Sequence, residues 1–419
     1  MTTGGQPSKQ LRRTLGVGDA VVIGLSSMIG AGIFAALAPA ARAAGAGLLI
    51  GLAAAGVLAY CNASSSARLA ALYPASGGTY VYGRERLGEF WGYLAGWGFV
   101  VGKTASCAAM ALTVGTYAWP AHAHVVAVTS VLALTVVNYL GVQKSTWLAR
   151  SIVAAVLLVL TAVVVAAFVF GAPDLAANLT TWHGISAGGV LQSAGLLFFA
   201  FAGYARIATL GEEVRDPART IPRAILIALA VTLAVYAGVA VAVLGVLGPR
   251  RVASTATPLV DAVRIAGAGW LVPIVAVGAV LAALGSLLSL LLGVSRTALA
   301  MARDRHLPRQ LDAVHPRFAV PHRAELAVGL VAASLAATVD LRGAIGFSSF
   351  AVLVYYAVAN ASAFTLRPEE GSLPKIIPVF GALGCVVVAF ALPLTSVIAG
   401  AAFLVLGAAV YWSRRLLRR

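Results

Sequence analysis

Long apolar segments separated by short polar ones run through nearly all of this 419-residue chain. A helix needs roughly 20 apolar residues to cross the hydrocarbon core of a membrane, and it satisfies its own backbone hydrogen bonds there. The apolar segments lie near 19–44, 46–72, 91–118, 123–141, 148–170, 188–210, 223–247, 269–301, 325–339, 343–365, 376–392 and 395–412. The pattern predicts an all-α polytopic membrane protein with about twelve transmembrane helices.

The composition agrees with this pattern and excludes other classes of protein. Charged residues make up only 11% of the chain, whereas a soluble domain carries about 25%. A soluble enzyme and a disordered chain are therefore excluded. The net charge of +16 does not indicate nucleic acid either, because the charges are few and scattered between apolar segments. The histidines and cysteines lack the spacing of a metal site, so we expect no metal and no cofactor.

The positions of the positive charges predict the orientation. With a cytoplasmic N-terminus, 23 of the 30 lysine and arginine side chains fall on the cytoplasmic side and five on the other. Because cytoplasmic loops carry an excess of such residues, both termini are predicted to be cytoplasmic. A composition rich in alanine, glycine and arginine favours the plasma (inner) membrane of a bacterium. Nothing in the sequence indicates an obligatory protein partner.

Glycines interrupt two of the predicted spans at mid-depth. Gly30 and Gly32 lie in the first span, and Gly203 lies in the sixth, five spans later. Paired interruptions in corresponding spans are typical of transporters built from inverted repeats. The predicted organisation is a cytoplasmic tail at 1–18, five-span repeats at 19–170 and 171–365, spans 11 and 12 at 366–412, and a basic tail at 413–419.

The physics of a broken helix suits a substrate that carries both charges. The break frees N–H groups at the positive end of a half helix, which attract a carboxylate. It also frees carbonyl groups, which accept hydrogen bonds from an ammonium group. The sequence therefore favours a secondary transporter of amino acids or related amines that works by alternating access. Protons are the candidate coupling ion, and exchange of substrates is the other open mode.

Four motifs, in order along the chain, resemble the amino acid–polyamine–organocation superfamily, and the bacterial relatives of the cationic amino acid transporters are the nearest branch. The first and third are IGAGIF at 29–34 and FFAFAGY at 198–204, the latter followed by EEVRDP at 212–217 and IPRA at 221–224. The second is PASGGTY at 74–80, followed by Gly96 and Trp97. The fourth comprises Ser295, Arg296, MARD at 301–304, Leu307 and Pro308. The resemblance implies a LeuT-like fold of five plus five spans with two peripheral ones.

The resemblance also implies roles for residues at the two breaks. The backbone at Gly30, Ala31 and Gly32 is expected to receive the substrate carboxylate, with Ile29 and Gly203 completing the two breaks. The carbonyl groups of Met28, Phe199 and Ala202 are expected to receive the ammonium group. By composition alone Phe199 is equally well a core or lipid-facing side chain, but its family position makes it the expected gate, together with Tyr204.

Two cations within the apolar segments are functional candidates by default, because a charge in the hydrocarbon core costs at least about 2.5–3.5 kcal/mol. They are Lys103 in the third span and Arg206, just after the break in the sixth. Some proton-coupled members of the superfamily carry a lysine in the fifth span, but here 152–158 has no ionisable group. We therefore expect Lys103 to supply the missing amine. Arg206 cannot readily release its proton, so it is expected to set the local field, form a pair or hold the helix break.

Two rival functions arise from other features of the sequence. The acidic loop at 212–216 suggests a prenyltransferase-like membrane enzyme that binds magnesium diphosphate. Such enzymes usually need a second acidic motif, and the pair Glu369 and Glu370 lacks the aspartate spacing, so an ion-pair network at the inner gate is the preferred interpretation. A sensor or channel is disfavoured, because the chain shows no soluble sensory domain and no repeated filter. We therefore expect a transporter and not an enzyme.

Overall fold

The computed structural model describes residues 15–73, 77–141, 146–179, 185–204, 207, 214–318 and 320–417. Its secondary structure is helical in these ranges, apart from a single bridge between Leu15 and Val214. The helices that follow the predicted spans are α1 (Val17–Met28), α2 (Ala31–Ala35), α3 (Leu37–Ala44), α4 (Leu48–Leu72), α6 (Glu89–Ala118), α7 (Ala123–Tyr139), α8 (Thr146–Val169), α10 (Ala187–Phe201), α12 (Pro217–Ser254), α14 (Val272–Arg303), α15 (His322–Thr338), α16 (Leu341–Phe364), α17 (Ile376–Ala391) and α18 (Leu394–Leu417). The prediction of an all-helical membrane protein is confirmed.

By helix length, the structure yields fewer membrane spans than the twelve that the sequence pattern predicts. Within the described ranges, ten helical segments are long and apolar enough to cross a membrane. The predicted ninth and eleventh spans correspond to α15 and α17, which have only 17 and 16 residues. A helix rises 1.5 Å per residue, so each of these two covers about 25 Å, somewhat less than the hydrocarbon core of a typical bilayer.

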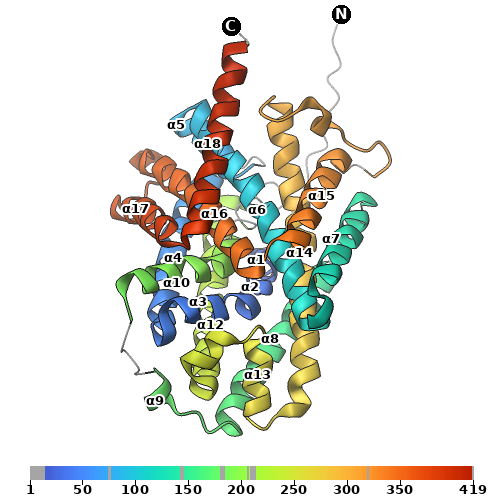
Figure 1. Ribbon diagram of the computed structural model, residues 1–419. Helices are drawn as coiled ribbons and strands as arrows, with labels where there is room; N and C mark the ends of the chain where they lie inside the picture. Colours follow the sequence, from blue (N-terminus) through green and yellow to red (C-terminus); the bar gives the residue numbers. More distant parts are fainter. Residues whose placement is uncertain are drawn as a thin grey trace, which may run out of the picture.

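Three short helices lie outside the predicted spans: α5 (Thr79–Leu87), α9 (Leu175–Leu179) and α13 (Pro258–Ile265). Glycines with positive φ bound α5 on both sides, Gly78 at 57° and Gly88 at 104°. Such backbone is readily adopted only by glycine, so these residues turn the chain sharply into and out of the helix. In Figure 1, α5 and the last turns of α18 lie at one end of the bundle, which we call the C-terminal face, and α9 and α13 lie at the other.

Two groups of helices meet at the centre of the bundle. In the first group α4 packs against α10 and α12, and α1 packs against α12. In the second group α6 packs against α14 and α7, and α15 packs against α7. Of the broken segments, α1 and α10 belong to the first group, and α2 contacts α10 of that group and α6 and α14 of the second (Figure 1). Large apolar side chains such as Leu383, Phe390 and Val405 remain exposed on the outer helices, as expected of a surface that contacts lipid.

Candidate functional site

The first span is broken where the sequence predicts it. α1 ends at Met28, Ile29 has a non-helical ψ of 60°, and Gly30 is extended toward α2, which begins at Ala31. The N–H of Gly30 donates to the carbonyl of Met28 at 2.8 Å. The N–H groups in the first turn of a helix have no intrahelical acceptor, so the start of α2 presents free donors at the centre of the bundle.

The sixth span changes its winding at the predicted place. α10 ends at Phe201, and Ala202–Tyr204 forms a tighter three-ten turn. This turn moves the carbonyl groups away from the α-helical ladder, which leaves them available to side chains or to a ligand. Arg206, the second predicted cation, lies outside the described residues.

Glycines let the two breaks touch each other. A methyl group at Gly203 would lie 2.2 Å from the carbonyl oxygen of Ser27, and one at Gly32 would lie 2.5 Å from the Cα of Ala200. A methyl group at Gly30 would lie 1.9 Å from Oγ of Ser286 on α14. All three distances are too short for any real side chain. The backbones of the first and sixth spans are therefore in direct contact, five spans apart in sequence.

Two tyrosines and a lysine donate hydrogen bonds to carbonyl groups at the breaks. The hydroxyl of Tyr236, on α12, donates to the carbonyl of Met28 at 2.5 Å and lies 3.3 Å from that of Ala200. The carbonyl of Ala202 accepts from the ammonium group of Lys103 and from the hydroxyl of Tyr356, each at 3.4 Å. An ammonium group of a substrate would have to replace these contacts at Met28 and Ala202.

Lys103 lies at the break of the sixth span, although it comes from the third. Its side chain is 7% exposed, and no carboxylate of the described residues lies within 4.0 Å of it. Within the same residues its hydrogen bond goes to the carbonyl of Ala202. A buried cation held by a neutral carbonyl group is poorly compensated, which is unusual for a side chain with a purely structural role.

The aromatic residues of α10 differ in exposure. Phe198 and Phe201 have no accessible surface, whereas Phe199 retains 8%. Tyr204 is fully buried, with its ring 5.1 Å from that of Tyr356. Of these three phenylalanines, only Phe199 retains any accessible surface, although it too is buried.

Sequence reasoning missed Tyr236 and Tyr356. Both lie near the middle of predicted spans, and a hydroxyl group buried in a membrane needs a partner. That signal marks the two residues as polar contacts, but it does not indicate the breaks as their partners. Only the packing of α12 and α16 against α1 and α10 does so.

Two of the three acids in the loop that suggested an enzyme, Glu212 and Glu213, lie outside the described residues. The last acid of the loop, Asp216, lies 3.8 Å from Arg219 in an exposed pair. This part of the loop agrees with an ion pair.

Comparison with known proteins decides between these functions. The family model for amino acid permeases matches residues 15–413. The chain belongs to the amino acid permease family. Among its relatives, a protein of Mycobacterium tuberculosis described as an uncharacterized transporter is 73% identical over 410 residues, which cover 98% of this chain and 93% of the relative.

Two more distant relatives are named for the amino acids that they transport. The branched-chain amino acid permease of Bacillus subtilis is 27% identical, with 96% of this chain and 93% of the relative covered. Human cationic amino acid transporter 4 is 30% identical, with 87% of this chain and 61% of the relative covered. This permease is therefore a multi-pass membrane transporter of amino acids and not an enzyme, and its family fits a LeuT-like fold. The predicted superfamily and function are confirmed, and nothing favours the prenyltransferase alternative.

Proposed function

We propose that this permease is a secondary transporter that carries its substrate between the two helix breaks by alternating access. The carboxylate is received by the backbone at Gly30, Ala31 and Gly32, and the ammonium group by carbonyl groups at Met28, Phe199 and Ala202. The observation that carries this proposal is the direct contact of the two breaks through Gly32 and Gly203. Two helices whose polar backbone groups meet in the apolar centre offer both halves of a zwitterion a partner.

The expected movement rearranges the contacts seen in the structure. Tyr236 and Tyr356 hold the carbonyl groups of Met28 and Ala202, and they release them when the substrate ammonium group arrives. Phe199 then covers the substrate, and Tyr204 moves with the three-ten turn. The repeats at 19–170 and 171–365 tilt against each other around this point, while 366–412 remains peripheral.

Lys103 is the proposed coupling group. An amine can bind and release a proton, and its contact with Ala202 links that event directly to the break. When the amine is neutral, the cation at the break disappears and the substrate ammonium group is no longer repelled. Because a proton on Lys103 and the substrate ammonium group then exclude each other at the break, exchange of the substrate against protons follows from this arrangement. Proton symport would require the amine to stay charged while the substrate is bound. Arg206, which follows the break in the sequence, keeps its charge throughout and sets the local field, forms a pair or holds the break.

The substrate class follows from the same cations. Lys103 at the break and Arg206 in the sequence next to it repel a cationic side chain, so neutral and anionic amino acids are preferred to lysine and arginine. The branched-chain permease of Bacillus subtilis supports this ranking, while the human cationic transporter would support the reverse. We also propose a bacterial inner membrane with both termini in the cytoplasm, on the basis of the distribution of lysine and arginine.

A thermal-shift screen of the detergent-purified permease tests the substrate class. The protein is heated with each amino acid, polyamines and other amino-group metabolites, because a ligand that binds only the folded state raises the unfolding temperature. Neutral or anionic amino acids are expected to stabilise it most. Arginine outcompeting alanine, serine and glutamate in a subsequent exchange assay in proteoliposomes would overturn the ranking. Stabilisation by a prenyl diphosphate with magnesium and by no amino acid would overturn the proposed function itself.

A further inference from the structure

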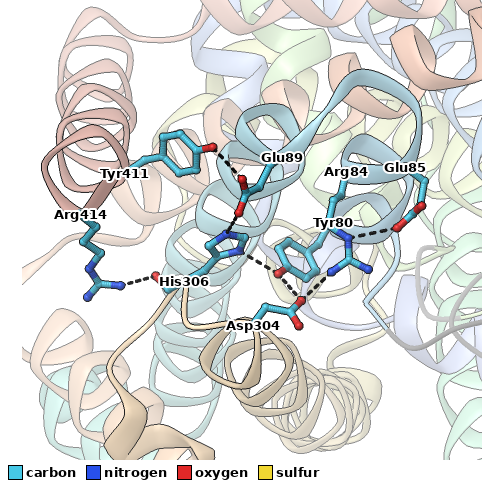
Figure 2. A network of polar contacts seen from close by, with 8 residues as sticks. All are labelled: Tyr80, Arg84, Glu85, Glu89, Asp304, His306, Tyr411 and Arg414. Carbon is cyan, nitrogen blue, oxygen red and sulfur yellow. Dashed lines mark hydrogen bonds and ion pairs between the residues drawn. The ribbon is translucent and has the colours of Figure 1, made fainter. Parts of the chain in front are cut away.

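A second polar cluster lies at the C-terminal face and is centred on His306. In Figure 2 the ring of His306 lies between Tyr80 of α5 and Glu89 at the start of α6, with Tyr411 of α18 on the far side of Glu89. His306, Tyr80 and Tyr411 are buried, and the ring centroid of His306 lies 5.3 Å from that of Tyr93. Four helices thus meet at one histidine.

The local backbone explains why His306 points back into the bundle. α14 ends at Arg303, and Arg305 has a φ of 61°, which L side chains rarely adopt. The N–H of His306 then donates to the carbonyl of Met301 at 2.7 Å, in the manner of a helix C-cap. The strained residue turns the chain, and His306 is folded back toward α5 and α6.

The hydrogen-bond partners of Tyr80 show where the first ring proton must lie. The hydroxyl of Tyr80 has one hydrogen, and it donates it to the carboxylate of Asp304 at 2.5 Å. Burial, together with this bond to Asp304, holds the pKa of Tyr80 far above its ordinary value, so the hydroxyl keeps its hydrogen. Nδ1 of His306 lies 2.8 Å from the same hydroxyl oxygen. A bond there requires a hydrogen on Nδ1.

The partner of the other ring nitrogen requires a second hydrogen. Nε2 of His306 lies 3.3 Å from Oε1 of Glu89, whose Oε2 accepts from the hydroxyl of Tyr411, also at 3.3 Å. A carboxylate is an acceptor only, so Nε2 must donate. A neutral imidazole carries one N–H and cannot serve both nitrogens. Both hydrogen bonds therefore form only when the ring of His306 is a charged imidazolium.

We propose that His306 is a proton-operated latch, which in its charged form ties α5 and α6 to the ends of α14 and α18 and in its neutral form releases Glu89. The helix α18 joins the same latch through Arg414, which donates to the carbonyl of His306 at 2.8 Å (Figure 2). Because α5 connects α4 to α6, and so the two groups of helices, the latch controls how firmly that connection is held. The proposal is independent of the substrate and of Lys103.

The charges around His306 come from every element packed on it. The carboxylates of Asp304 and Glu89 lie on the two sides of the ring, and Arg84 of α5 and Arg414 of α18 lie beside them. Arg84 is itself paired with Asp304 at 2.7 Å. The titratable and charged groups that the described contacts place at the cluster are Tyr80, Arg84, Glu85, Glu89, Tyr93, Asp304, Tyr411 and Arg414.

Hydrogen–deuterium exchange tests the latch without any substrate. The purified permease is labelled at about pH 6 and about pH 8, on either side of the usual titration range of histidine, with labelling times scaled for the chemical exchange rate. In the unmodified protein, protection of amides in α5 and in the last turns of α18 is expected to fall about three- to tenfold at the higher pH, as expected when a hydrogen bond is lost.

The decisive variant is Glu89→Gln, because an amide can donate to a neutral Nε2. This variant is expected to keep its protection at both pH values, and His306→Gln is expected to lose it at both. His122→Gln, an exposed histidine outside the cluster, is the matched control and should behave like the unmodified protein. Protection that does not change with pH in the unmodified protein, or Glu89→Gln following the unmodified protein, would overturn the proposal even if His306→Gln failed to fold.

Discussion

The helix breaks at the centre and the C-terminal face differ in how their positive charges are paired. At the centre, Lys103 is buried, and among the described residues its hydrogen bond goes to the carbonyl of Ala202. At the face, Arg84 pairs with Asp304 and Glu85, and Arg86 pairs with Glu370. A charge that is fully paired holds a structure together, whereas a buried charge with a weak partner is ready to change its state. The paired arginines of the face thus hold its helices together, whereas the centre is built for exchange of contacts.

The largest effect is expected from a side chain that forces the two helix breaks apart. Gly203→Val places methyl groups where Ser27 already lies, so uptake in proteoliposomes should fall by more than about tenfold, through a shift of the first span that costs at least 1.4 kcal/mol at the site. The measurement is uptake of the best amino acid found in the thermal screen. Gly238→Ala is the control, because a methyl group there meets nothing within 4 Å. Equal loss in both variants would show that the contact at Gly203 has no special role.

The second largest effect is expected from removing the amine of Lys103 or fixing its charge. Lys103→Ala removes the amine, and Lys103→Arg keeps a charge that cannot be released. Both variants are expected to transport slowly and to lose the pH dependence of uptake, which is measured in proteoliposomes over a range of internal and external pH. Wild-type rates with an unchanged pH profile in both variants would remove Lys103 from the coupling mechanism.

A moderate effect is expected from removing the hydroxyl group of Tyr236. Tyr236→Phe removes the donor to Met28 and leaves that carbonyl to the N–H of Gly30. Loss of one buried hydrogen bond should lower the free energy of unfolding by about 1–1.5 kcal/mol. Thermal unfolding of the purified protein reports it. Because the same carbonyl is then open to a ligand, substrate affinity should not fall in parallel, and a matching fall in affinity would argue that Tyr236 itself binds the substrate.

The smallest effect is expected at the C-terminal face. The hydrogen bond from Arg86, with one from the N–H of Arg367, holds the pKa of Glu370 below its usual value. The folded state therefore binds this proton less tightly than the unfolded state, and the stabilisation is present above the ordinary carboxyl range and lost as the pH falls through it, from about pH 5 downward. Glu370→Gln should flatten this part of the stability profile slightly. An identical acid profile in variant and unmodified protein would mean that the pair contributes nothing measurable.

Some features of these two regions could be predicted from the sequence and others could not. The breaks at Gly30 and Gly203 were predicted because two glycines at mid-depth in corresponding spans are rare outside such sites. The contacts made by Tyr236 and Tyr356 were not, because a tyrosine in a span has several helices as possible neighbours. The helix α5 was not predicted either, since it is polar and short and depends on Gly78 and Gly88 to turn the chain.

The sequence by itself determined the helical membrane fold, the family, and the two places where helices break. The fold follows from local physics, because an apolar segment must hydrogen-bond to itself in lipid. The two breaks follow from paired glycine motifs in corresponding spans. Only the tertiary structure decided that Lys103 of the third span reaches Ala202 of the sixth, and that Glu89 and Tyr80 meet His306 more than 200 residues later. Partners of a buried polar group are chosen by the packing of distant helices, and no local pattern along the chain records that choice.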